Sequence, residues 1–137
     1  MASNLDSLIM DPIIRRLDDY EWAGWPEEQV RARGEVTWKA LQGDPTDETD
    51  MVLGVARVLK GQSLEAHRHE PPETYYVLSG SGIVTIEHKE YPVDPDTMLY
   101  IPGDALHQIN NYEDEPLRIL YLFATNDFGK VIYRFPE

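Results

Sequence analysis

The chain lacks several features that would assign it to particular classes of protein. None of its 137 residues is cysteine, which excludes a disulfide framework and a thiolate metal ligand. No apolar run approaches the roughly 20 residues that a bilayer-spanning helix needs. The first residues do not join a basic stretch to an apolar one, so no secretory signal is expected and the predicted location is the cytoplasm.

Positive charge is also scarce. Lysine and arginine total 12 against 25 aspartates and glutamates, which gives a formal net charge of −13. A nucleic-acid backbone attracts lysine and arginine, so we expect no nucleic-acid partner. Anionic membranes are disfavoured for the same reason. A small-molecule substrate or ligand stays open, because a metal and a few lining residues set the field inside a pocket.

What the chain does have, from about residue 36 onward, is a series of short alternating segments separated by glycine, proline and aspartate. Its length suits one domain, and no clear helix is expected after residue 34. The pattern predicts an all-β sandwich or barrel. The expected strands are residues 36–41, 51–59, 63–69, 74–79, 83–86, 90–93, 98–101, 108–111, 117–124 and 131–135.

The N-terminal stretch has a different texture. We predict that residues 1–34 are an irregular or short-helical extension, not an independent domain, and that residues 35–137 form the barrel. Residues 13–20 fit a short helix or a strand that pairs with a partner subunit. Pro26 suits the start of one helical turn.

The same stretch predicts a homodimer. Ile13, Ile14, Trp22 and Trp25 make it too apolar to move freely in water. Small barrels expose sheet edges, and packing these residues on a neighbouring barrel would cover one.

Three of the four histidines lie in one pattern. On an extended strand, alternate side chains share a face, so His67 and His69 point the same way. Glu73 follows, and His107 comes from a distant segment. Imidazoles and a carboxylate that meet in this way make a cage for a divalent metal. The fourth histidine, His88, lies in a polar turn and is expected to be solvated and without function.

The segment from Gly61 to Gly80 resembles the first motif of the cupin family. The motif runs glycine, five residues, His-x-His, three residues, glutamate, six residues, glycine, and every fixed position is met here. The resemblance implies that His67, His69 and Glu73 are metal ligands. It also implies a double-stranded β-helix, a jelly-roll barrel that brings non-adjacent strands together around a cavity.

Residues 96–111 resemble the second cupin motif, with Pro102, His107 and Asn111 in their expected places. The resemblance implies His107 as the fourth ligand. Asp96 and Asp104 stand where the family usually has glycine. Both are predicted turn positions, because aspartate tolerates left-handed backbone better than most residues.

One divalent transition metal per subunit is therefore expected. Three imidazoles and one carboxylate leave two positions open in an octahedral sphere, and open positions distinguish a catalytic site from a closed structural one. The ligand mix suits Fe, Mn, Ni, Co or Zn and does not choose among them.

Strand parity places Tyr75 and Val77 on the face of Glu73. The Tyr75 phenol could bind a substrate carboxylate, act as a general base, or fill the core. Glu-x-Tyr beside His-x-His resembles the cupin-type dimethylsulfoniopropionate lyases, in which the metal holds the substrate carboxylate and a tyrosine removes the α proton. That resemblance implies Tyr75 as the base. The same run also resembles cupins of unrelated activity.

Other residues carry weaker expectations. Asn111 fits a brace of the barrel mouth that bonds to backbone, or a plain turn residue. Arg57 and Arg118 are expected to face outward. Five residues are candidates for the pocket wall or the ordinary core: Trp38, Met98, Tyr100, Ile109 and Phe123.

Three functions stay open. The first is a metal-dependent lyase or isomerase acting on a small carboxylate, with Tyr75 as the possible base. The second is an Fe(II)-dependent dioxygenase, and the third is a non-catalytic cupin that binds a metal or small ligand. The fold alone hosts all three.

Overall fold

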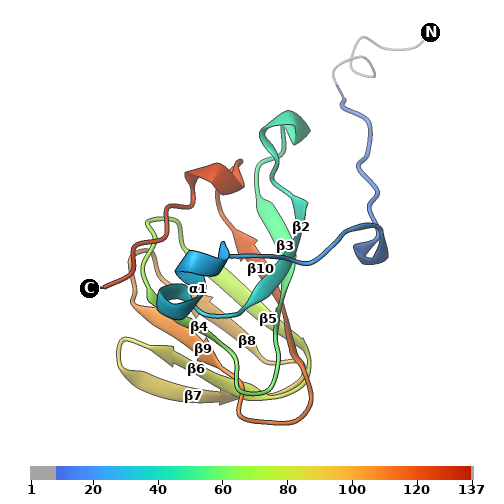
Figure 1. Ribbon diagram of the computed structural model, residues 1–137. Helices are drawn as coiled ribbons and strands as arrows, with labels where there is room; N and C mark the ends of the chain where they lie inside the picture. The colour runs from blue at the N-terminus through green and yellow to red at the C-terminus, as the bar shows by residue number, and fades with distance from the viewer. Residues whose placement is uncertain (1–8, 137) are drawn as a thin grey trace, which may run out of the picture.

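The structure, a computed structural model, describes residues 9–136 and consists of two antiparallel sheets (Figure 1). The six-stranded sheet has the order β1-β2-β3-β10-β5-β8 and the four-stranded sheet the order β4-β9-β6-β7. This confirms the expected all-β jelly-roll barrel. The strands are β1 Ala23–Gly24, β2 Thr37–Gln42, β3 Val52–Val58, β4 Ser63–His67, β5 Glu73–Ser79, β6 Gly82–Ile86, β7 Lys89–Val93, β8 Met98–Ile101, β9 His107–Asn110 and β10 Leu117–Phe123.

The core lies between the two sheets and follows from period-2 alternation. Every second residue of β10 is buried, and its central position between β3 and β5 explains why both of its edges are paired. In β5, Glu73, Tyr75 and Val77 are buried while Tyr76 and Leu78 are exposed. The parity expected for Tyr75 is therefore the parity observed.

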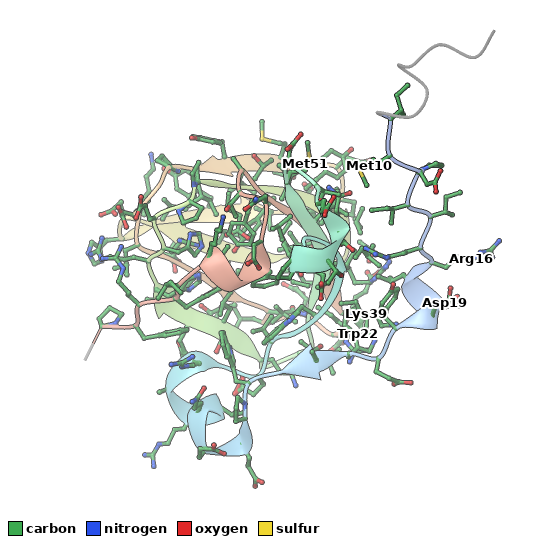
Figure 2. The ribbon with its side chains drawn as sticks, turned by 90° about the horizontal axis from the view of Figure 1, so that it is seen from above. Met10, Arg16, Asp19, Trp22, Lys39 and Met51 are labelled. Carbon is green, nitrogen blue, oxygen red and sulfur yellow. The ribbon has the colours of Figure 1, made fainter. Side chains whose placement is uncertain are left out.

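The N-terminal part of the described chain packs on the barrel at several points. The 3-10 turn η2 (Leu17–Asp19) and β1 precede helix α1 (Glu27–Arg33), which begins directly after Pro26. Residues 13–20 are thus neither a helix nor a strand but extended chain followed by one 3-10 turn. Figure 2 shows Trp22 beside Lys39, and the Arg57 guanidinium lies 4.2 Å from the Trp22 ring.

Residues 131–135 do not form the expected strand. A 3-10 turn, η4 (Phe128–Lys130), leads into extended chain that joins the barrel through one bridge, between Arg68 and Arg134. The alternation that suggested a strand is real, because Val131 is buried and Tyr133 and Phe135 are partly buried between exposed neighbours. The alternation arises because the rings of Tyr133 and Phe135 pack against the buried ring of His67, not because the backbone pairs along a sheet.

None of the helices in residues 9–136 has the length and apolar character required to cross a bilayer.

Candidate metal centre

Three imidazoles meet at one end of the four-stranded sheet. The antiparallel register of β4 and β9 places His67 directly opposite His107, and His69 lies two residues beyond the end of β4. Their ring centroids are 4.1 Å (His67–His107), 4.8 Å (His69–His107) and 5.4 Å (His67–His69) apart. All three are at most 1% exposed, and their ligand atoms lie within 4.8 Å of one another, so this group could hold a metal ion.

The backbone fixes which nitrogen of each ring faces the centre. Nδ1 of His67 lies 2.8 Å from the Glu65 carbonyl, and Nδ1 of His107 lies 2.8 Å from the Ala105 carbonyl. Nδ1 of His69 lies 2.9 Å from the Pro71 carbonyl in the same way. A carbonyl only accepts, so this network assigns the proton of each neutral ring to Nδ1 and leaves a lone pair on Nε2. Such a second bond normally orients a metal-binding histidine.

Glu73 reaches the same centre from the opposite sheet. Its Oε1 lies 3.2 Å from Nε2 of His69 and 3.3 Å from Nε2 of His107, and its side chain is 4% exposed. Two lone-pair nitrogens against a buried carboxylate repel one another unless a proton or a cation lies between them. Within residues 9–136, Nε2 of His67 and Nε2 of His107 have no hydrogen-bond partner. The donor set therefore fits a divalent cation.

Electrostatics favour the neutral, ligand form of His67. Burial lowers its pKa well below the ordinary value of 6.5, and the nearby His107 and His69 rings lower it further. A neutral imidazole is the form that binds a metal.

Tyr75 lies in the interior, 2% exposed, and its ring centroid is 6.3 Å from that of His107. Burial raises the pKa of its hydroxyl well above 10, and the negative charge of Glu73 adds to the increase. Tyr75 also lines a cavity of about 310 Å³ beside the histidines.

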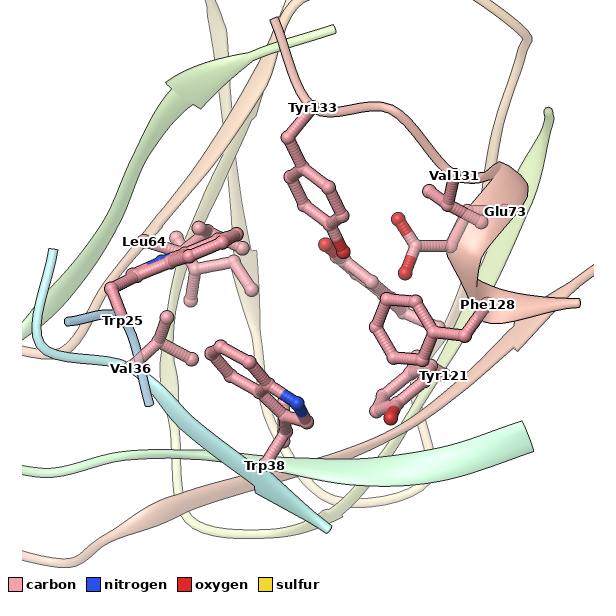
Figure 3. Close-up of a pocket in the computed structure, with 12 residues that line it drawn as sticks. Trp25, Val36, Trp38, Leu64, Glu73, Tyr121, Phe128, Val131 and Tyr133 are labelled. Carbon is pink, nitrogen blue, oxygen red and sulfur yellow. The ribbon is translucent and has the colours of Figure 1, made fainter. Parts of the chain in front are cut away.

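Half of the residues that line this cavity are aromatic, and the others except Glu73 are aliphatic (Figure 3). Glu73 supplies its one carboxylate, and the hydroxyl of Tyr121 is buried with no partner among the described residues. The Trp25 ring packs edge-on against Trp38 and Tyr133, with ring centroids 5.1 Å and 5.4 Å apart. The lining consists of Trp25, Val36, Trp38, Ala56, Leu64, Glu73, Tyr75, Ile109, Tyr121, Phe128, Val131 and Tyr133.

The structure sorts the residues that the sequence left between wall and core. Trp38 and Ile109 line the cavity, whereas Phe123 is buried in the core and packs edge-on against His69 at 5.0 Å. Met98 and Tyr100 are 60% and 58% exposed, so the prediction that they line the pocket or belong to the core is wrong. Both point outward because they pair with Tyr76 and Thr74 of β5, whose side chains lie on the outer face of the same sheet.

Asn111 is a brace, but not at the mouth. Its Nδ2 donates to the carbonyls of Val58 and Glu115, both at 2.9 Å, and its Oδ1 accepts from Glu113 N. Asn111 follows the last residue of β9, whereas His107 is the first, so these bonds lie at the far end of β9 from the histidines. They join the loop after β9 to Val58, the last residue of β3.

Several cavity residues were not anticipated from the sequence. Tyr133, Phe128 and Val131 come from the C-terminal segment, and Trp25 comes from the chain before α1. The one available signal was the alternation of Tyr133 and Phe135, which sequence reasoning interpreted as a strand.

These features define a class of single-barrel proteins with a buried three-histidine group at one end. Residues 54–123, just over half of the chain, match the cupin domain family, and the protein therefore belongs to the cupins. The chain is also 46% identical over 103 residues to the dimethylsulfoniopropionate lyase DddW of Ruegeria pomeroyi, a match that covers 74% of this chain and 67% of the lyase. An uncharacterized protein of Methanocaldococcus jannaschii is 35% identical over 69 residues, covering 50% and 55% of the two chains.

Solved structures agree on the fold. A cupin-2 domain from Rhodospirillum rubrum superposes with a TM-score of 0.74 at 21% identity, covering 95% of this chain and 84% of that one. The polyketide cyclase RemF from Streptomyces resistomycificus gives 0.73 at 22% identity, covering 94% and 87%.

Proposed function

We propose that this cupin is a metal-dependent lyase of a small carboxylate substrate, and that dimethylsulfoniopropionate is the first substrate to test. The observation that carries the proposal is the set of three buried imidazoles facing Glu73, beside an aromatic cavity that contains Tyr75. The likeness to DddW supports the reaction class, since that relative is named for this lyase activity.

His67, His69, His107 and Glu73 are the proposed ligands of one divalent transition metal per subunit. Each ring would bind through Nε2, because Nδ1 donates to backbone. Such a donor set accepts Fe, Mn, Ni, Co or Zn and leaves positions open for a substrate oxygen.

The cavity favours a substrate with a cationic end. Aromatic faces attract onium groups, and Trp25, Trp38, Tyr121 and Tyr133 all line the wall. The negative charge of Glu73 also favours a cation and repels a free carboxylate. A small zwitterion suits both the metal and the aromatic wall, because its carboxylate would bind the metal while its onium group would lie among the aromatic rings.

Tyr75 is the proposed general base. A bound divalent cation would polarise the substrate carboxylate and offset the charge of Glu73, which favours loss of the Tyr75 proton. The Tyr75 oxygen would then take the proton α to the carboxylate. The electron pair of that C–H bond becomes the new C=C bond, and the β C–S bond breaks to release a neutral sulfide.

The experiment combines metal analysis with two activity screens. Protein purified without added metal is analysed for metal content, then assayed with that metal for release of dimethyl sulfide and for oxygen uptake. Release of sulfide without oxygen uptake is the expected result. Oxygen uptake alone would favour a dioxygenase over the lyase. If the protein shows neither activity, the remaining function is that of a non-catalytic cupin that binds a metal or a small ligand.

Tyr75→Phe tests the base within the same assay. It keeps the buried ring and removes the hydroxyl, so turnover should fall by about 10²-fold or more, as is typical when a general base is lost. Metal content should stay unchanged. Tyr76→Phe is the matched control, because Tyr76 faces outward and its hydroxyl donates to Asp96 at 2.9 Å. Equal turnover in wild type and Tyr75→Phe would eliminate this role.

A homodimer is also proposed, on narrower grounds than the sequence offered. Trp22 and Trp25 pack on their own barrel, so they no longer argue for a partner. Ile14 is 88% exposed, and Ile9 and Met10 are 70% and 51% exposed on chain that extends away from the barrel (Figure 2). A second copy that covers these side chains would remove apolar surface from water.

A further inference from the structure

The C-terminal segment of residues 131–135, here called the strap, lies across the histidine end of the barrel. The Tyr133 ring stacks on His67 with centroids 4.9 Å apart and planes inclined by 28°, and it meets His69 edge-on at 5.3 Å. The Phe135 ring lies 5.5 Å from that of His67. The strap therefore forms the wall that separates two of the proposed ligands from solvent.

The strap is held on its outer side by a small polar network. The backbones of Arg68 and Arg134 exchange two hydrogen bonds, of 2.9 and 2.8 Å. The Arg134 guanidinium forms an ion pair with the Asp104 carboxylate. The Arg68 guanidinium donates to the Asp104 carbonyl at 3.0 Å. The strap is also held by the burial of Val131 and the packing of Tyr133 and Phe135, and the Arg33 guanidinium lies 4.9 Å from the Phe135 ring.

Asp104 links the strap to the loops that carry the histidines. Its backbone N–H donates to the His69 carbonyl at 2.8 Å, and it lies three residues before His107. It adopts a left-handed conformation with φ of 63°, where glycine would be unstrained. A glycine would keep the backbone contact to His69 and lose the carboxylate that pairs with Arg134.

We propose that Asp104 and Arg134 are positioning residues, a latch that keeps the strap closed and so holds Tyr133 over His67. The latch is exposed on both sides, at 56% for each side chain. Exposed ion pairs are weak and are screened by salt, so this one can open and close at ambient temperature. Opening would expose the ligand end to the medium. The part of the proposal that concerns metal and substrate rests on the proposed function above.

The test compares Asp104→Gly with wild type by hydrogen exchange of the strap amides. Glycine relieves the left-handed strain, so the turn and the fold should survive. Strap exchange should rise about two- to fivefold, the range expected for the loss of one exposed ion pair. Raising the ionic strength should speed exchange in wild type but not in Asp104→Gly.

Asp114→Ala is the matched control. It removes an exposed ion pair with Lys60, which lies beyond the ends of β4 and β9 opposite the histidines. Arg134→Gln removes the same latch from the strap side and should act like Asp104→Gly, with no further effect in the double variant. Unchanged strap exchange in both single variants, or an equal rise in Asp114→Ala, would overturn the latch.

Metal release gives a second readout. Asp104→Gly should bind as much metal as wild type. After a chelator is added, the variant should lose its metal faster than wild type, by a factor similar to the rise in strap exchange. A rise in strap exchange with no change in release rate would restrict the latch to the strap and overturn its link to the ligands. Protein that binds no metal would instead refute the proposed function, and the exchange experiment would still decide the latch.

Discussion

A metal bound by His67, His69, His107 and Glu73 should stabilise the fold, and the size of that effect follows from mass action. At a free metal concentration 100 times Kd, the added free energy of unfolding is about 2.7 kcal/mol. A chain of 137 residues has an unfolding entropy of roughly 0.3 kcal/mol/K, so Tm should rise by about 9 °C. Differential scanning fluorimetry with a metal series measures this shift.

Replacing His67 and His69 together by alanine should abolish the shift. Both rings are almost fully buried, so the double variant also leaves a cavity and lowers the Tm of the metal-free protein. The informative quantity is therefore the difference in Tm with and without metal within one variant. That difference should fall below about 1 °C, because removal of two of four ligands takes Kd far above the metal concentration used.

His88→Asn is the control for this experiment. His88 is the exposed fourth histidine, in a left-handed turn with φ of 68° that asparagine tolerates. Its metal-induced shift should match that of wild type. A full shift in the His67→Ala, His69→Ala double variant would refute the ligand assignment, and a reduced shift in His88→Asn would mean that the effect is nonspecific.

Three further outcomes are expected. Asn111→Ala should lower the free energy of unfolding by about 1–3 kcal/mol, because buried backbone groups lose their partner; chemical denaturation measures this, and a neutral result would contradict the brace. Arg15 lowers the pKa of Asp47 to about 2, so wild type should exceed Asp47→Asn in stability at neutral pH. Since a lowered folded pKa stabilises only the ionised form, the advantage should be full above about pH 5 and lost as the pH falls toward 2; acid titration of both proteins checks the sign. Light scattering at micromolar concentration should show a dimer, and Ile14→Asp should shift it toward monomer; a monomeric wild type would exclude the assembly.

The sequence by itself determined the class of fold and the candidate ligands. Alternation in segments such as residues 117–124 predicts a half-buried strand without any knowledge of its neighbours, because side-chain period is a local property. The spacing of His67, His69 and Glu73 is local in the same sense. The boundary at residue 34, the cytoplasmic location and the metal-binding role of these side chains stay predictions.

Only the tertiary structure decided which side chains from distant parts of the chain contact one another. Sequence spacing does not place His67 opposite His107, since that pairing depends on the register of two strands joined through a folded barrel. The tautomers, by contrast, are set locally, because each Nδ1 donates to a carbonyl only two residues away in the chain. The alternation of residues 131–135 shows the limit most directly. A local pattern records that every second side chain is buried, but whether a sheet or a group of histidines buries it depends on contacts between residues far apart in the chain.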